Sequence, residues 1–498
     1  MRCWRERTLV VDGASNAFRA RSTSSGSATT HSTRGSLHRI ITGAALPLTE
    51  RKAEFIVARM LPLADVFAKS GFQRAAVNLG WLIGERAVRF VLSVVVGFVV
   101  ARHLGPERLG VLSYCIAVVT LLSGVAGLGL EAVVKRDLLK SSGSEAGLLA
   151  SAAALRLMAG LVTVLGLIVL TTWSPTAEER RLLMILAVTL FQPAWLVSDL
   201  WLQAHLRAKF AVMAQTAALA AAAGVRLLLV VQDAPLAAFG LAVVMESALA
   251  AVGITWLARR AGLQFSWKAA KAATMRRLFL ESWPLMFAGL AITLYMKIDE
   301  VMLRHLAGPG AVGIYSAATR LTEIWYFFPI ALGASLLPAL MRARERGDQA
   351  YGERLQHYYD VNATVAYALS VPMALAAPWV IRVAYGPTFA ASAPIVVVHI
   401  WSSVFVFIGV ARSQWLVNEG LQQFYLYATL TGAVINIVLN VMVIPRWGGL
   451  GAAAATVVSQ AFASWLSSYF SAATRSTARM QTRALLVPLL GWRYLRRT

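Results

Sequence analysis

Charged residues are scarce in this sequence. Asp, Glu, Lys and Arg make up 14% of its 498 residues, whereas soluble domains carry about a quarter. The hydrophobic fraction is 58%, and a single soluble core stops growing at about 250–300 residues. The composition therefore excludes an ordinary water-soluble protein and predicts one whose solvent is lipid.

Residues for catalysis and metal binding are also few. The two cysteines are Cys3 near the start and Cys115 inside an apolar run, and we expect neither a disulfide framework nor a thiolate metal site. The sequence has no P-loop, HExxH or CxxC motif, and no long polar segment that could form a nucleotide-binding domain. We therefore expect no metal, no cofactor and no enzyme activity.

Among the charged residues, the acidic ones are fewer than the basic ones. The chain has 24 Asp and Glu against 47 Lys and Arg, a formal net charge of +23. The basic residues lie between long apolar runs and are not gathered in one basic domain. This distribution follows the positive-inside rule of membrane proteins and argues against a nucleic-acid partner.

Long apolar runs, in contrast, are abundant. From Ala75 onward, stretches long enough to cross about 30 Å of hydrocarbon recur with short gaps. They predict an all-α integral membrane protein with about twelve transmembrane helices. The predicted spans are residues 75–101, 109–131, 147–172, 182–205, 210–232, 235–258, 281–304, 311–340, 361–385, 390–417, 422–445 and 448–472.

The basic residues also predict the orientation of the chain. The loop between the sixth and seventh spans and the C-terminal tail are the most basic, so both chain ends are expected in the cytoplasm. Residues 1–74 are rich in Arg, Ser and Thr and lack apolar periodicity, which predicts a disordered extension. Alternatively, this stretch is an organelle transit peptide, or the native start is Met60 and residues 1–59 do not belong to the protein.

A short repeat divides the chain at the basic central loop. Each copy lies between the first two spans of its half, and all its residues keep the same separation. The copies are Gly105, Pro106, Gly110 and Ser113, and Gly308, Pro309, Gly313 and Ser316. A second echo pairs Trp201, Leu202 and Phe210 with Trp415, Leu416 and Phe424. Together the two echoes predict two six-helix bundles in parallel orientation, related by an axis along the membrane normal. The predicted parts are an extension (1–74), an N-terminal bundle (75–258), a basic cytoplasmic linker (259–280), a C-terminal bundle (281–472) and a basic cytoplasmic tail (473–498).

Charged residues inside the spans are candidates for function, because each costs about 3 kcal/mol near the bilayer centre. In the first span, Glu85 and Arg89 are one turn apart and can pair, which leaves Arg86 without a local partner. Arg86 then either belongs to an anion site in a central cavity or forms a fixed salt bridge to another helix. For Arg156 in the third span, the alternatives are the same cavity and snorkelling toward the cytoplasmic headgroups.

The seventh and eighth spans hold the densest group of charges. Lys297, Asp299 and Glu300 lie in one, and Arg320 and Glu323 lie in the other. Because the two helices are antiparallel, both groups fall in the outer half of the membrane. They predict either a static, mutually neutralised network or a gate whose ion pairs break and re-form during transport.

Other polar residues in the spans have local explanations. Glu246 can pair with Arg226, with ion coupling as the alternative, and Arg226 itself lies close to the outer end of its span and is expected to snorkel. Asn436 and Asn440 are one turn apart and are expected to hydrogen-bond between helices.

Three stretches resemble a known transporter family. They are residues 101–114, residues 295–329, which include the sequence GIYSAATRLTE, and residues 435–456. The chain resembles the polysaccharide-biosynthesis flippases of the multidrug/oligosaccharidyl-lipid/polysaccharide exporter superfamily, over about residues 75–472. The middle stretch is the most specific, and its motif combines Asp299 with GIYSAATRLTE, so Asp299, Arg320 and Glu323 are the charged candidates inside the motif itself.

The resemblance implies two six-helix bundles with alternating access across a bacterial inner membrane. The implied substrate is an undecaprenyl-diphosphate-linked oligosaccharide, such as an O-antigen or exopolysaccharide unit, moved from the inner to the outer leaflet. Membrane lipid, glycosyltransferases and a glycan polymerase are the implied partners. The expected substrate-binding residues are Arg86, Arg89, Arg156 and Arg320, and the expected gating network is Glu85, Lys297, Asp299 and Glu323.

Two other functions compete with this one. A drug/cation antiporter of the same superfamily would favour acidic residues in its cavity, whereas arginine predominates at mid-depth here. A membrane glycan polymerase or ligase would need a large outer loop for its acceptor, and the predicted outer loops are short.

Overall fold

The computed structural model describes residues 70–140, 145–172 and 176–488. All regular elements in these ranges are helices. The chain divides into two units, Met1–Ile83 and Gly84–Thr498, and the helix packing described here is that of the second unit. The predicted extension lies almost entirely outside the described residues, as does the end of the tail.

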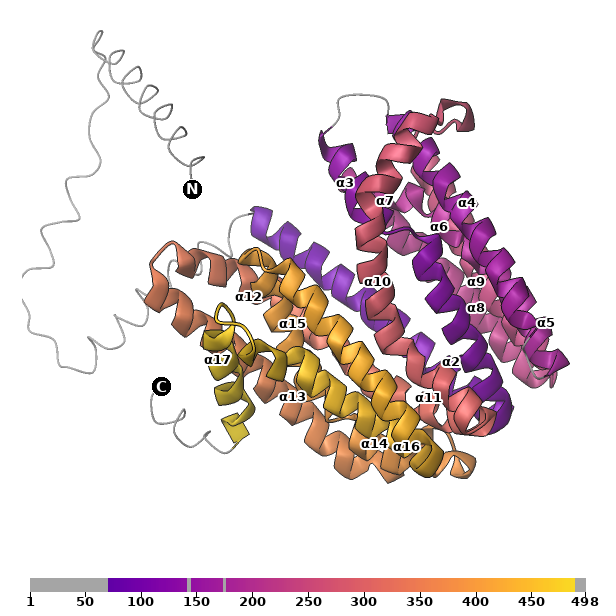
Figure 1. Cartoon of the computed structure of the whole chain (residues 1–498). Coiled ribbons are helices and arrows are strands. Elements are labelled where there is room, and N and C mark those ends of the chain that lie inside the picture. Colours follow the sequence, from indigo (N-terminus) through magenta and orange to yellow (C-terminus); the bar gives the residue numbers. More distant parts are fainter. Residues whose placement is uncertain (1–69, 141–144, 173–175, 489–498) are drawn as a thin grey trace, which may run out of the picture. The chain divides into compact units, whose positions relative to one another are not determined.

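The helices follow one another along the chain with short connections (Figure 1). Those before the central loop are α2 (Ser70–Ala126), α3 (Leu130–Lys140), α4 (Glu145–Thr171), α5 (Ala177–Leu186), η1 (Ala187–Phe191), α6 (Gln192–Trp195), α7 (Val197–Ala204), α8 (Ala208–Val231) and α9 (Leu236–Arg260). The later ones are η2 (Trp267–Ala269), α10 (Ala272–Leu306), α11 (Pro309–Glu323), η3 (Ile324–Tyr326), α12 (Phe327–Arg344), α13 (Asp348–Ala384), η4 (Pro387–Phe389), α14 (Ser392–His399), α15 (Ser402–Asn418), α16 (Gln422–Ser464), η5 (Leu466–Tyr469) and α17 (Arg475–Leu485).

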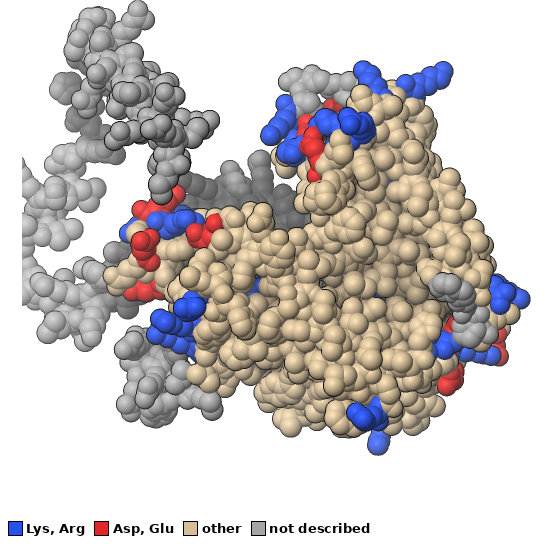
Figure 2. Space-filling model, viewed as in Figure 1, with Lys and Arg blue, Asp and Glu red and all other residues tan. Residues whose placement is uncertain are grey.

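Large apolar side chains cover much of the molecular surface. Leu375, Val162 and Trp379 are 81%, 65% and 68% exposed, which is favourable only where the surrounding solvent is hydrocarbon. Figure 2 shows the charged side chains of the viewed face gathered near helix ends, with broad uncharged surface between them. Nine helices of the described part are long and apolar enough to span a membrane, so this is a multi-pass membrane protein.

The nine helices that could span a membrane are fewer than the twelve predicted spans for two reasons. Helices α2 and α16 each continue through a glycine with non-helical dihedrals, Gly105 (φ 69°) and Gly448 (φ 53°). Each of these long helices therefore contains two of the predicted apolar runs. The eighth predicted run, 311–340, is divided among α11, η3 and α12.

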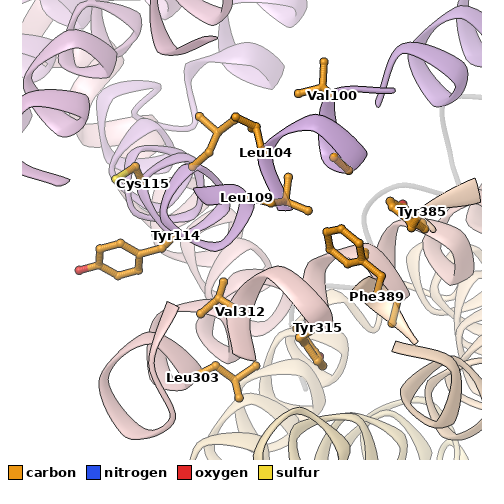
Figure 3. Packing of buried hydrophobic residues seen from close by; sticks show 14 of the residues in the cluster. Val100, Leu104, Leu109, Tyr114, Cys115, Leu303, Val312, Tyr315, Tyr385 and Phe389 are labelled. Carbon is orange, nitrogen blue, oxygen red and sulfur yellow. The ribbon is translucent and has the colours of Figure 1, made fainter. Parts of the chain in front are cut away.

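The largest buried cluster joins segments that are far apart in the sequence. Leu104 and Leu109 of α2 pack there with Val312 and Tyr315 of α11 and with Phe389 of η4, as Figure 3 shows. A second cluster lies mainly among α3, α4 and α7–α9, and a third among α12, α13, α15 and α17. Helix α10 packs against α3 and α4 and also against α16, so it connects the earlier helices to the later ones.

Candidate functional site

The two copies of the Gly-Pro repeat contact each other. Gly110 of α2 packs on the backbone carbonyl of Pro309, and Gly313 of α11 packs on the carbonyl of Pro106. A Cβ atom would lie 2.7 Å from the Pro309 carbonyl carbon at Gly110, and 2.8 Å from the Pro106 carbonyl carbon at Gly313. Only glycine therefore permits this approach without a backbone shift. The reciprocal contact is the geometry expected of two segments related by a two-fold axis.

A buried ion pair lies near this contact. Arg304, in the last turn of α10, donates from Nε to Glu179 Oε1 of α5, whose side chain is 0% exposed. The Arg304 guanidinium also lies over the Tyr114 ring of α2, 5.9 Å from its centroid. Tyr114 contacts His305 edge to face. These contacts tie α10 to α2 and α5.

Neither member of that pair is among the predicted site residues. In the sequence, Glu179 belongs to a run in which acids and arginines balance, and Arg304 resembles an ordinary cation at a helix end. Because the two residues are 125 positions apart, no local spacing could have paired them.

The predicted charge network of α10 and α11 forms in part. Lys297 Nζ lies 2.8 Å from Glu300 Oε1, and Glu323 interacts electrostatically with Lys297 and Arg320. Arg320 is exposed, and its Nη2 lies 3.5 Å from the Ser113 hydroxyl of α2. Two cations and two carboxylates therefore lie together where α11 meets α2.

Asp299 is hydrogen-bonded to neutral groups and not to the cations of this network. It is 4% exposed and accepts hydrogen bonds from Tyr315 Oη (2.6 Å), Thr456 Oγ1 (2.5 Å) and Asn440 Nδ2 (2.6 Å). Asn440 also donates to Asn436 Oδ1 at 3.1 Å. Within the described part of the chain, no Lys or Arg pairs with Asp299, so the partners given for this buried carboxylate are neutral donors from α11 and α16.

The chemistry of the Asp299 group suits a proton or a small hard cation. Oxygen atoms of Asp299, Asn436, Asn440 and Thr456 lie together, and hard cations prefer carboxylate and carbonyl oxygen ligands. Asn440 Oδ1 is buried and accepts no hydrogen bond within the described residues. Among the described residues, no three or more His, Cys, Asp or Glu side chains are grouped so that they could hold a metal ion.

The four predicted substrate arginines have different surroundings. The side chains of Arg86 and its neighbour Glu85 lie outside the described part of the structure. Arg89 is half-buried and donates to Gln215 Oε1 of α8 at 3.3 Å. Arg156 is 6% exposed and donates to the carbonyls of Gly127 (3.3 Å) and Pro193 (2.9 Å). Of the three described side chains, Arg320 alone is exposed.

Arg156 satisfies backbone groups where helices break. The chain between α2 and α3 turns through positive φ at Leu128 and Gly129, which leaves the Gly127 carbonyl outside a regular helix. Pro193 lies at the start of the short helix α6. The Gly127 carbonyl also accepts a hydrogen bond from the Leu130 N–H at 3.3 Å. Because a carbonyl that is not hydrogen-bonded inside a membrane costs several kcal/mol, the bond to Pro193 stabilises its break and the bond to Gly127 adds to the backbone one.

Two further arginines within the spans have polar partners. Arg226 Nη2 lies 2.7 Å from Glu246 Oε2, which confirms the predicted pairing. Arg412, absent from the predicted site, is 2% exposed and donates to the Ser467 and Ser468 hydroxyls at 2.8 and 2.9 Å.

Comparison with known proteins identifies related sequences. The sequence model of the family described as "Polysaccharide biosynthesis protein" matches residues 75–344, and the model described as "MatE" matches residues 284–442. The "Probable flippase AglR" of Haloferax volcanii is 28% identical over 184 residues, which are 34% of this chain and 37% of AglR. The "Probable low-salt glycan biosynthesis flippase Agl15" of the same organism is 26% identical over 191 residues, 36% of this chain and 39% of Agl15. The chain thus spans under two fifths of the length of these curated relatives.

A solved structure shares the fold over more of the chain. The structure described as "Lipid II flippase MurJ, inward closed conformation" has a TM-score of 0.63 and 14% sequence identity. The match covers 82% of this chain and 91% of that one. At this identity the likeness concerns the arrangement of the helices.

Proposed function

Because the chain belongs to the polysaccharide biosynthesis protein family, we propose that it is a flippase for a lipid-linked oligosaccharide. The proposed substrate is an undecaprenyl-diphosphate-linked repeat unit, moved from the inner to the outer leaflet of a bacterial inner membrane. The names of the two archaeal relatives and of the structurally similar lipid II flippase support transport of a lipid-linked glycan. Glycosyltransferases that make the unit and a polymerase that consumes it are the proposed partners.

The proposed architecture has twelve spans in two six-helix halves, residues 75–258 and 281–472, with both termini in the cytoplasm. The single observation that carries the proposed mechanism is the reciprocal contact of Gly110 with Pro309 and of Gly313 with Pro106. Through this contact the two Gly-Pro segments pack closely against each other, and they can move apart together with the helices that carry them. Separation on the outer side and closure on the inner side would constitute alternating access.

Arg320 is the proposed contact for the diphosphate. The residue is exposed, and a planar guanidinium can bind two phosphate oxygens at once. Glu323 and Glu300 lie close enough to compete for the cations when substrate is absent. We expect Arg320 and Lys297 to exchange carboxylate partners for phosphate oxygens as the lipid enters.

Two driving forces are compatible with this site. With the cytoplasm electrically negative, outward movement of each negative charge is favoured by about 2.3 kcal/mol per 100 mV. The Asp299 group supplies a second possibility, because a buried carboxylate with neutral partners can couple transport to H⁺ or Na⁺. Collapse of the membrane potential, removal of Na⁺ and dissipation of the pH gradient, made separately in loaded proteoliposomes, distinguish the two.

Cells that lack the protein provide the test of function. We expect lipid-linked oligosaccharide to accumulate on the cytoplasmic face, and the wild-type protein to clear it. Arg320→Ala should fail to clear it at equal expression, whereas Arg226→Ala, which removes a cation paired within α8 and α9, should retain most activity. A complete absence of accumulation, with no other flippase present, would contradict the proposal.

Drug/cation antiport is the second candidate, favoured by the MatE match over residues 284–442. In that case the deleted strain would become drug-sensitive without accumulating lipid-linked glycan, and Asp299→Asn would impair resistance more than Arg320→Ala.

A further inference from the structure

A cavity of about 430 Å³ lies between the end of α12 and the start of α13. The two helices are joined by a short turn and pack side by side (Figure 1). Ala339 and Ala343 of α12 and Ala350 of α13 line the cavity, and their small side chains leave the space open. Its volume lies within the range of about 300–1,000 Å³ that is typical of ligand pockets.

The walls of the cavity are basic. Arg342 and Arg346 come from α12, and Arg354 and His357 come from α13. The lining contains one acid, Glu353, which accepts a hydrogen bond from Gln349 at 3.2 Å. In the described part of the chain, none of the three arginines forms an ion pair. The cavity therefore carries a net positive charge.

Four acids on or beside these helices do not line the cavity, and two of them have other partners. Glu419 binds Arg344 through both carboxylate oxygens, at 2.9 and 3.1 Å, and accepts a third bond from Tyr351 at 2.9 Å. Asp360 accepts from Gln356 at 2.8 Å. Glu345 and Asp348 lie in or beside the connecting turn, exposed, and do not line the cavity. Arg344 thus neutralises Glu419, and the arginines of the cavity remain available.

The position of the cavity along α12 indicates the kind of ligand. The helix has no charged residue from Phe327 to Met341, and Arg342 is the first charge after this apolar stretch. Such a boundary is expected at the level of lipid headgroups. A ligand with a phosphate in the cavity could therefore keep its hydrocarbon chain beside the apolar part of the bundle.

We propose that this cavity binds the phosphate or diphosphate group of a membrane lipid on the cytoplasmic side. The role rests on the proposed function: the cavity is a loading site that holds the diphosphate of the lipid-linked glycan before it reaches Arg320. Three arginines provide the forked donors that a diphosphate requires, and the adjoining apolar stretch accounts for the lipid part.

Binding can be measured without transport. The full chain is placed in phosphatidylcholine nanodiscs and titrated with undecaprenyl diphosphate, and bound lipid is counted by native mass spectrometry. The same titration with inorganic pyrophosphate tests for a soluble ligand. The test variant is Arg346→Gln/Arg354→Gln. Its matched control is Arg475→Gln/Arg479→Gln, which removes two exposed arginines from α17.

We expect the cavity variant to bind undecaprenyl diphosphate at least about 10-fold more weakly, because two charge-assisted hydrogen-bond donors are lost. The control should change binding less than about 2-fold, and pyrophosphate alone should bind weakly to all proteins. Equal losses in both variants would show a general attraction to basic surface and overturn the proposal. Tight binding of pyrophosphate would overturn its lipid part, and unchanged binding in the cavity variant would overturn it entirely. A protein that binds as expected but transports no glycan would contradict the proposed function and leave the site intact.

Discussion

Replacement of Arg304 should weaken the contact between the two Gly-Pro segments. Arg304→Met removes the charge and the donors, and leaves Glu179, which is 0% exposed, without its ion-pair partner. Loss of one partner of a buried pair costs about 3–5 kcal/mol. Because Arg304 is 12% exposed and water reaches part of it, the lower figure applies. About 3 kcal/mol corresponds to a roughly 100-fold shift of the equilibrium away from the contact state.

Distances between a spin label on α5 and a spin label on η4 report this equilibrium. Labels at Arg180→Cys in α5 and Thr388→Cys in η4, both exposed, are introduced with Cys3→Ser, while the buried Cys115 stays in place. Arg304→Met should add a longer-distance population, and Glu179→Gln with Arg304→Met should restore much of the original one, because no unpaired buried charge remains.

The matched control is Arg226→Met, which breaks the 2.7 Å pair with Glu246 inside the α8–α9 hairpin. It should lower thermal stability without lengthening the distance between the labels. An unchanged distribution in Arg304→Met, or an equal change in Arg226→Met, would refute the idea that the Arg304–Glu179 pair holds the contact closed.

Three further changes test other parts of the structure. Gly110→Ala or Gly313→Ala should reduce transport at least about 10-fold, because overpacking costs about 1–3 kcal/mol, while Gly166→Ala, with no atom within 4 Å of the added Cβ, should be nearly neutral in the same flipping assay. Asp299→Asn should abolish any dependence of transport on H⁺ or Na⁺, measured with imposed ion gradients, and an unaltered dependence would exclude the Asp299 group as the coupling site. Arg156→Leu should lower the free energy of unfolding by about 1–3 kcal/mol, because the Pro193 carbonyl loses the hydrogen bond from Arg156 and the Gly127 carbonyl keeps only the bond from the Leu130 N–H, and a melting temperature equal to that of the wild type would contradict the structural role of Arg156.

The membrane character of the chain follows directly from its sequence. Apolar runs of sufficient length specify spanning helices, because hydrocarbon leaves the backbone no hydrogen-bond partners except its own. The Gly-Pro repeat was also visible, and the structure brings its two copies into contact. What the sequence could not show is how close that contact is, since it depends on a crossing of α2 and α11 that is set by the whole bundle.

Side-chain direction explains the main difference within the predicted charge group. Asp299 is two residues from Lys297, and residues two apart on a helix do not face each other. Lys297 therefore lies with Glu300, while Asp299 turns toward α11 and α16. Helical spacing, applied strictly, could have separated Asp299 from Lys297 in advance, but it could not have identified Asn440 and Thr456 as its partners.

The sequence could not predict ion pairs between residues that are far apart along the chain. Glu179 and Arg304 meet because α10 packs against earlier helices, and nothing in their local sequences indicates it. Arg156 presents a different case: an arginine inside a span suggested either a substrate site or snorkelling, and in the structure its hydrogen bonds go to carbonyls at helix breaks, which no sequence pattern had located.

Transfer of a lipid-linked oligosaccharide between the leaflets of a reconstituted vesicle tests the proposed function most directly. The purified chain is incorporated into vesicles that contain an undecaprenyl-diphosphate oligosaccharide, and a glycosidase added outside cleaves only the outward-facing glycan. A flippase predicts that the protected inner fraction becomes cleavable with wild-type protein and stays protected with Arg320→Ala at equal incorporation. A protected fraction that is the same in protein-free and wild-type vesicles, with an imposed membrane potential and Na⁺ and H⁺ gradients present, would contradict it.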